Sequence, residues 1–159
     1  MRRTEQGFTL IELIVVITIL GILAAVALPR LINAQTDARI AKAQGLYGSV
    51  RSAAALAKSR CELDLARGLT AAGTCGNAPQ QVTMDGLAVS MVNRYPAASA
   101  TGIIRAAQID TVNDGVTVAG AAPLTITING AATAANCRIS YTAAPANGSP
   151  TITLVTTGC

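Results

Sequence analysis

The feature that most constrains this chain is an apolar stretch of twenty-one residues, from Phe8 to Leu28, whose only polar members are Thr9, Glu12 and Thr18. A helix of about 20 such residues is long enough to span a bilayer. The sequence therefore predicts a membrane helix near the N-terminus, to which the rest of the chain is attached.

Glu12 is unusual in such a stretch. A carboxylate inside an apolar span costs about 2.5 to 3.5 kcal/mol on insertion scales. The nearest cations, Arg2, Arg3 and Arg30, all lie outside the stretch. We therefore expect Glu12 to meet a charge from another molecule, the alternatives being that it is protonated or reaches the lipid headgroups.

Residues 1–7 form a short basic leader whose two arginines place the N-terminus on the cytoplasmic side. An ordinary secretory signal is the alternative, because Ala25-Val26-Ala27 offers a cleavage site that would leave Leu28 as the mature start. Two observations oppose it. The apolar stretch is longer than the roughly 7 to 15 residues of a signal core, and it contains a charge.

The remaining chain is long enough for one small domain. It has no Trp and a single Phe, so the core is expected to consist of small side chains. The absence of histidine removes the commonest general base and the commonest metal ligand, and a net charge of +4 is too small to indicate nucleic-acid binding. The sequence therefore predicts neither an enzyme nor a metal or cofactor site.

The run Gly7-Phe8-Thr9-Leu10-Ile11-Glu12-Leu13, followed by the apolar stretch and Pro29, resembles the N-terminus of type IV pilin and pseudopilin precursors. The resemblance implies that a prepilin peptidase cuts after Gly7 and methylates the new amino terminus at Phe8. Glu12 would then pair with the amine of a neighbouring subunit. It also implies local unwinding of the assembled helix between Gly21 and Pro29.

A helical pattern resumes beyond Pro29. Apolar residues recur at three- and four-residue steps, and the helix is expected to end between Ser59 and Arg67, with Gly68 as its stop signal. This half is predicted to cover a domain with one apolar stripe, made of Ala43, Leu46, Val50, Ala53, Ala54 and Ala57.

The rest of the chain is typical of an antiparallel sheet. The turn Asp85-Gly86 predicts a hairpin between residues 81–84 and 87–92, and Ser99 is a candidate cap for a short helix over 99–108. Strands are expected at 116–119, 124–128, 137–142 and 151–156. The sheet should pack on the apolar stripe, which gives an α+β fold. The Asp85-Gly86 turn, Tyr95-Pro96 and Ala100-Thr101-Gly102-Ile103 are similar to the mannose-sensitive haemagglutinin branch of type IV pilins.

Four cysteines, Cys61, Cys75, Cys137 and Cys159, allow three disulfide pairings in a chain expected to leave the cytoplasm. We expect Cys61 to pair with Cys75, which would attach the loop over 68–81 to the end of the helix. A Cys137–Cys159 bond would resemble the C-terminal disulfide loop of pilins. Metal binding is the alternative, but CxxC spacing is absent.

The expected organisation is a leader at 1–7, a hydrophobic helix at 8–29 and a pilin head at 30–159. The resemblance implies a homopolymeric pilus subunit for adhesion or surface motility. Its implied partners are the peptidase, an assembly ATPase with its inner-membrane platform, and an outer-membrane secretin. The subunit would wait in the inner membrane of a Gram-negative bacterium before joining an extracellular filament. Alternatives are a type II secretion pseudopilin, a minor pilin, an anchored periplasmic binding protein and an anchored hydrolase.

Overall fold

The computed structural model describes residues 8–69, 71 and 73–159. The predicted leader, and Gly7 with it, lies outside the described residues. The chain divides into two units, Met1–Asp37 and Ala38–Cys159, and we describe each by itself.

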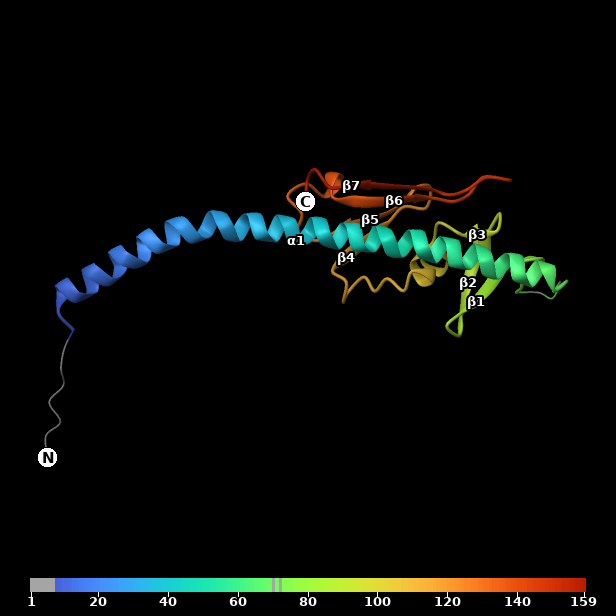
Figure 1. Ribbon diagram of the computed structural model, residues 1–159, viewed down its shortest axis with the longest axis horizontal. Helices are drawn as coiled ribbons and strands as arrows, with labels where there is room; N and C mark the ends of the chain where they lie inside the picture. The colour runs from blue at the N-terminus through green and yellow to red at the C-terminus, as the bar shows by residue number, and fades with distance from the viewer. Residues whose placement is uncertain (1–7, 70, 72) are drawn as a thin grey trace, which may run out of the picture. The chain divides into compact units, whose positions relative to one another are not determined.

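One long helix is followed by seven short strands (Figure 1), which confirms the predicted α+β class. The helix runs through both units, and the strands all belong to the second. The helix is α1 (Leu10–Ala66), and the strands are β1 (Gln81–Met84), β2 (Leu87–Val92), β3 (Tyr95–Pro96), β4 (Val116–Ala119), β5 (Leu124–Ile128), β6 (Arg138–Thr142) and β7 (Thr151–Val155).

Helix α1 ends within the predicted range, and Gly68 provides the stop. Gly68 has a φ of +65°, a conformation that glycine adopts without steric cost. Its N–H donates to the carbonyl of Leu65 at 3.0 Å, and the N–H of Leu69 donates to that of Asp64 at 3.1 Å. These two bonds form a Schellman motif, which satisfies carbonyls that the last helical turn leaves without partners.

The strands form two antiparallel sheets rather than the single sheet that the sequence suggested. The first has the order β1-β2-β3 and contains the predicted hairpin, with Met84 opposite Leu87 across Asp85-Gly86. Both turn residues have positive φ, as a type I′ turn requires. The second sheet is a meander in the order β4-β5-β6-β7.

The second half of α1 takes part in two cores, one for each sheet. Ala43, Val50 and Ala54 pack in the first core, which includes Ile126 and Ile139 of the four-stranded sheet. Helix residues Ala53, Ala57 and Cys61 pack in the second core with Val82, Val89 and Met91 of the three-stranded sheet. The stripe predicted from the sequence is therefore the surface that joins the two sheets.

A further hydrogen bond connects the sheets. The buried hydroxyl of Tyr141 on β6 donates to the carbonyl of Pro96 on β3 at 2.7 Å. The short helix predicted over 99–108 is a π-helical turn, η1 (Ala100–Ile104), within which Gly102 departs from helical geometry. The hydroxyl of Ser99 accepts from the N–H of Gly102 at 3.0 Å, so Ser99 is the cap that the sequence indicated.

Candidate assembly surface

The first part of α1 presents an apolar surface that no described residue covers. Every residue from Phe8 to Gln35 is exposed, and the large apolar side chains among them are between about half and more than four-fifths exposed. By length and composition, α1 can cross a membrane, since its most apolar window has a mean hydropathy of 2.8. Exposed apolar surface of this extent marks a site that contacts membrane or protein.

Glu12 lies in the first turn of α1, next to Thr9. The backbone N–H of Glu12 donates to the Thr9 hydroxyl at 3.4 Å, and that hydroxyl donates to a carboxylate oxygen of Glu12 at the same distance. Thr9 thus caps the helix, and a carboxylate in the first turn also suits the helix dipole. The T-x-x-E spacing of Thr9 and Glu12 is itself a capping signal in the sequence. These long hydrogen bonds leave the charge without a cation among residues 8–29 of the described chain.

Phe8 lies outside the helix. Because Thr9 is the cap and α1 begins at Leu10, Phe8 and Glu12 do not share a helical face. Phe8 is 84% exposed. An amine created at this residue would therefore be free to approach a carboxylate on another molecule.

Gly21 and Pro29 lie inside α1, which is continuous across both. A side chain at Gly21 would meet nothing within 4 Å. Pro29 has no N–H, so the carbonyl of Ala25 lacks its usual helical donor. The segment between them is thus the part of the exposed helix with the weakest backbone support, and its unwinding remains a prediction.

Both disulfides lie in the second unit. Cys61 on α1 is bonded to Cys75 in the loop that precedes β1, and Cys137 is bonded to Cys159, with Cα atoms 5.2 and 4.8 Å apart. Arg39 of α1 donates from Nη1 to the carbonyl oxygen of Cys159 at 3.1 Å, which fastens the second bond to the helix. In the part of the chain that the structure describes, no cluster of metal-ligating side chains gathers.

A polar hollow of about 480 Å³ lies on the second unit near the end of α1. Its walls come from α1, the loop before β1, the β2–β3 turn and the turn before β7. Asn93 fixes two of these walls, because its side-chain amide donates to the carbonyl of Ala144 at 2.8 Å. We call this the head hollow, and its main lining side chains are Lys58, Glu62, Gln80, Arg94, Tyr95 and Asn147.

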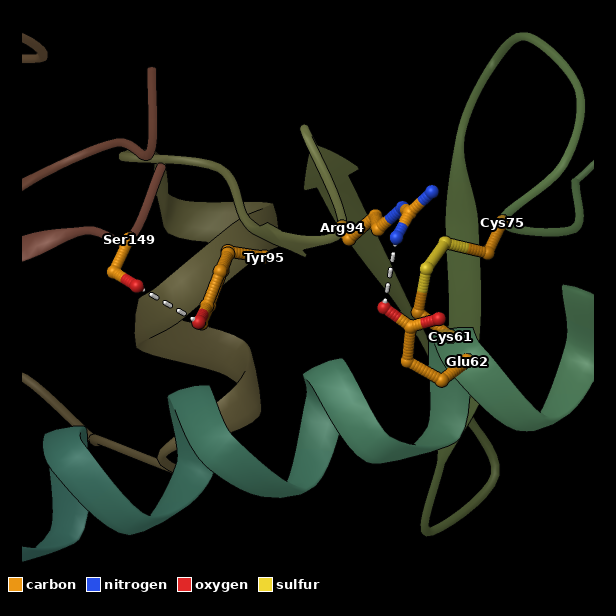
Figure 2. A network of polar contacts seen from close by, with 6 residues as sticks. All are labelled: Cys61, Glu62, Cys75, Arg94, Tyr95 and Ser149. Carbon is orange, nitrogen blue, oxygen red and sulfur yellow. Dashed lines mark hydrogen bonds and ion pairs between the residues drawn. A yellow bond between two sulfur atoms is a disulfide. The ribbon is translucent and has the colours of Figure 1, made fainter. Parts of the chain in front are cut away.

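Charged and aromatic groups are linked inside the head hollow (Figure 2). Arg94 donates through Nη1 to a carboxylate oxygen of Glu62 at 3.2 Å. The ammonium of Lys58 lies 5.1 Å from the centre of the Tyr95 ring. The Tyr95 hydroxyl is 3.2 Å from that of Ser149. This hydrogen bond and the Lys58 ammonium hold the pKa of the Tyr95 phenol below its usual value.

The backbone around the head hollow is strained. Asn93, Arg94 and Asn147 have positive φ, and Arg94, at +70°, occupies a turn position that favours glycine. A residue other than glycine in this conformation costs about 1 kcal/mol or more. The ion pair with Glu62 is more than two-fifths exposed on both sides, and such pairs contribute roughly 0.2 to 1 kcal/mol. The ion pair with Glu62 therefore does not by itself account for an arginine at this strained position.

The sequence did not indicate the head hollow. The available signal was Asn93-Arg94 between two short apolar runs, which is the pattern of a hairpin turn with a cation in place of glycine.

Comparison with known proteins agrees with the N-terminal geometry. Residues 2–28 match the family model of the prokaryotic N-terminal methylation motif. Over 52 residues, a third of this chain, it is 48% identical to a Thermus thermophilus protein described as a type IV narrow pilus major component PilA5, of which the match covers 45%.

Two further relatives match a similar stretch. Type II secretion system core protein G of Pseudomonas aeruginosa is 42% identical over 52 residues, and type IV major fimbrial protein FimA of Dichelobacter nodosus is 40% identical over 53 residues. The matches cover 37% and 34% of these proteins, so the chain spans less than half the length of the curated relatives it matches. No solved structure matches the chain. With its methylation motif, its exposed apolar helix and its α+β fold, the chain is a pilin-like protein whose N-terminal third is similar to those of type IV pilins and of a type II secretion core protein.

Proposed function

We propose that this chain is the structural subunit of a type IV pilus, which polymerises through the exposed part of α1 into an extracellular filament for adhesion or surface motility. The observation that carries the proposal is the uncovered apolar surface from Phe8 to Ile32, with Glu12 near its start. Bilayer lipid would cover this surface before assembly, and neighbouring helices would cover it afterwards.

Cleavage after Gly7 supplies the charge that Glu12 lacks. The new N-methylated amine at Phe8 is cationic, and it extends from the cap rather than from the helix. In a staggered bundle it would meet Glu12 of the next subunit in an apolar medium, where opposite charges attract strongly. The segment from Gly21 to Pro29 would then loosen when the helices pack.

The experiment replaces Glu12 with Gln and counts the filaments sheared from cells. Loss of the charge should reduce filament numbers by about tenfold or more, because the subunit amine would have no partner in the apolar core. Asp37→Asn is the matched control, since it removes an exposed carboxylate of the same helix beyond the apolar surface. Wild-type filament numbers from the Glu12→Gln strain would refute the assigned role.

Mass spectrometry of the subunit tests the processing step separately. N-methyl-Phe8 at the mature terminus is expected. A retained leader, or a mature start at Leu28 as an ordinary secretory signal would give, would contradict the proposal.

The partners follow from the same reaction sequence. The subunit would be processed by prepilin peptidase, moved by an assembly ATPase acting through an inner-membrane platform, and passed through an outer-membrane secretin. It would span the inner membrane of a Gram-negative bacterium once before assembly.

A type II secretion pseudopilin is the second candidate, because the similarity to core protein G covers the same N-terminal stretch. Deleting the gene separates the two functions. Loss of surface filaments with normal protein secretion supports the pilus subunit, and loss of secretion with normal filaments supports the pseudopilin.

A further inference from the structure

Beyond the polymerising helix, we propose that the head hollow binds an acidic saccharide, with Arg94 holding a sugar carboxylate. The proposal depends on the second unit alone, and it is independent of whether the chain polymerises. The hollow is large enough, at about 480 Å³, for a small ligand.

Backbone strain is concentrated around the head hollow. Three of the five described residues other than glycine that have positive φ, namely Asn93, Arg94 and Asn147, line the hollow. Strained residues gather where binding requires a fixed geometry. Asn93 and Asn147 tolerate such angles well, but Arg94 does not, so its side chain is the feature that requires explanation.

The position of Arg94 suits a ligand carboxylate. Among described residues, its guanidinium makes one hydrogen bond, through Nη1 to Glu62. Figure 2 shows its other terminal nitrogen pointing away from Glu62. Glu62 thus orients the guanidinium of Arg94, and the remaining N–H donors keep the planar arrangement that matches a carboxylate.

The charge of the hollow favours a monoanion. Lys58 and Arg94 are cationic and Glu62 is anionic, which leaves one net positive charge. A dianion such as a phosphate monoester would exceed the single net positive charge of the hollow and would face repulsion from Glu62.

The other lining groups suit hydroxyls. Gln80 and Asn147 contribute amides, Tyr95 contributes a hydroxyl, and Leu65 is the one large aliphatic side chain in the lining. A peptide with apolar side chains would find little surface to bury there. A hydroxyl-rich sugar that carries one carboxylate matches both the net positive charge of the hollow and its polar lining.

The test uses the full processed chain in detergent micelles and titration calorimetry. The probe is a galacturonic acid trisaccharide, and its methyl ester is the uncharged counterpart. The acid should bind saturably at one site, and the ester about tenfold or more weakly, because it lacks the charge that Arg94 recognises.

Arg94→Gly is the decisive variant. Glycine accepts the φ of +70°, so the fold should melt at the wild-type temperature or higher while the trisaccharide binds about tenfold or more weakly. Arg94→Lys should bind the trisaccharide with an affinity between those of the wild type and Arg94→Gly. Glu62→Gln should bind it more tightly than the wild type, because a repelling charge is removed. Arg51→Ala is the matched control, since it removes an exposed cation of α1 outside the hollow.

Several results would overturn the proposal. These are no binding of the trisaccharide, equal binding of acid and ester, unchanged binding by Arg94→Gly, or a tetraglutamate peptide that binds as tightly as the sugar. A lower melting temperature for Arg94→Gly with unchanged binding would assign the arginine to stability. Filament counts test the polymerisation proposal separately, so either proposal can fail without the other.

Discussion

The two parts of α1 gain their stability differently. Between Phe8 and Gln35 every side chain is exposed, whereas between Ala43 and Asp64 one face is buried against two sheets. The apolar face of the second part is covered by other residues of the same chain. The first part needs an environment that the chain does not supply, which is what a subunit that moves from membrane to filament requires.

A matched pair of valines tests this comparison with the largest expected effect. Val50 is fully buried and Val26 is 61% exposed. Val50→Asp should destabilise the head by about 4 kcal/mol or more, because it buries an unpaired charge. Thermal unfolding of the chain in detergent, followed by circular dichroism, measures the loss. Val26→Asp should leave the head transition unchanged, and an equal loss in both variants would remove the distinction between the two parts.

Tyr141 tests how far the buried part relies on the connection between the sheets. Tyr141→Phe removes the hydroxyl that donates to Pro96 and leaves a buried carbonyl unpaired. The expected loss is about 1 to 3 kcal/mol in denaturant unfolding. If the loss is negligible, the helix and the remaining contacts hold the two sheets together without this hydrogen bond.

Alkaline pH should weaken the same region. Burial raises the pKa of Tyr141 above its usual value. Since the unfolded phenol titrates near about 10, the folded state retains its proton above that pH, and stability falls with a slope of at most about 1.4 kcal/mol per pH unit. The lowered pKa of Tyr95 acts in the opposite direction just below pH 10, but that side chain is more exposed. Melting temperatures between pH 8 and 11 should decline for the wild type and less for Tyr141→Phe.

Two glycines of the second unit should respond with opposite signs. Gly68 has a φ of +65°, so Gly68→Ala should cost about 1 kcal/mol. Gly45 is helical and a side chain there would meet nothing within 4 Å, so Gly45→Ala should add up to about 1 kcal/mol. Melting temperatures of the two variants measure the difference. A destabilising Gly45→Ala would mean that the solvent-facing side of this helix is more constrained than its contacts show.

Much of the fold was predictable because local signals agreed. The apolar period of α1, the stop at Gly68 and the Asp85-Gly86 turn each determine structure within a few residues, and the expected pairs Cys61–Cys75 and Cys137–Cys159 are those that the structure has. The division into two sheets was not predictable. How the two sheets meet depends on contacts between distant residues, such as the hydrogen bond of Tyr141 with Pro96 across 45 residues, which no local pattern encodes.

The assembly surface and the head hollow also differ in how far the sequence predicts them. The assembly surface is one continuous stretch, so its composition reveals it. The head hollow takes its walls from four distant segments, and only folding brings Lys58, Arg94 and Asn147 together. The capping role of Thr9 was predictable from its spacing to Glu12, because T-x-x-E is a local capping signal.

The disulfides also determine how the chain would behave under tension, which a filament subunit experiences whenever its filament is pulled. The loops closed by Cys61–Cys75 and Cys137–Cys159 span sequence separations of 14 and 22 residues. At about 3.6 Å per residue these bonds withhold roughly 50 and 80 Å of chain from extension. A force applied along α1 passes from Cys61 directly to Cys75, and the loop between them carries no load. Beyond Cys61, the segment between Cys75 and Cys137 is the part of the head that can lengthen, so the two loops closed by the disulfides remain closed while the chain between them extends.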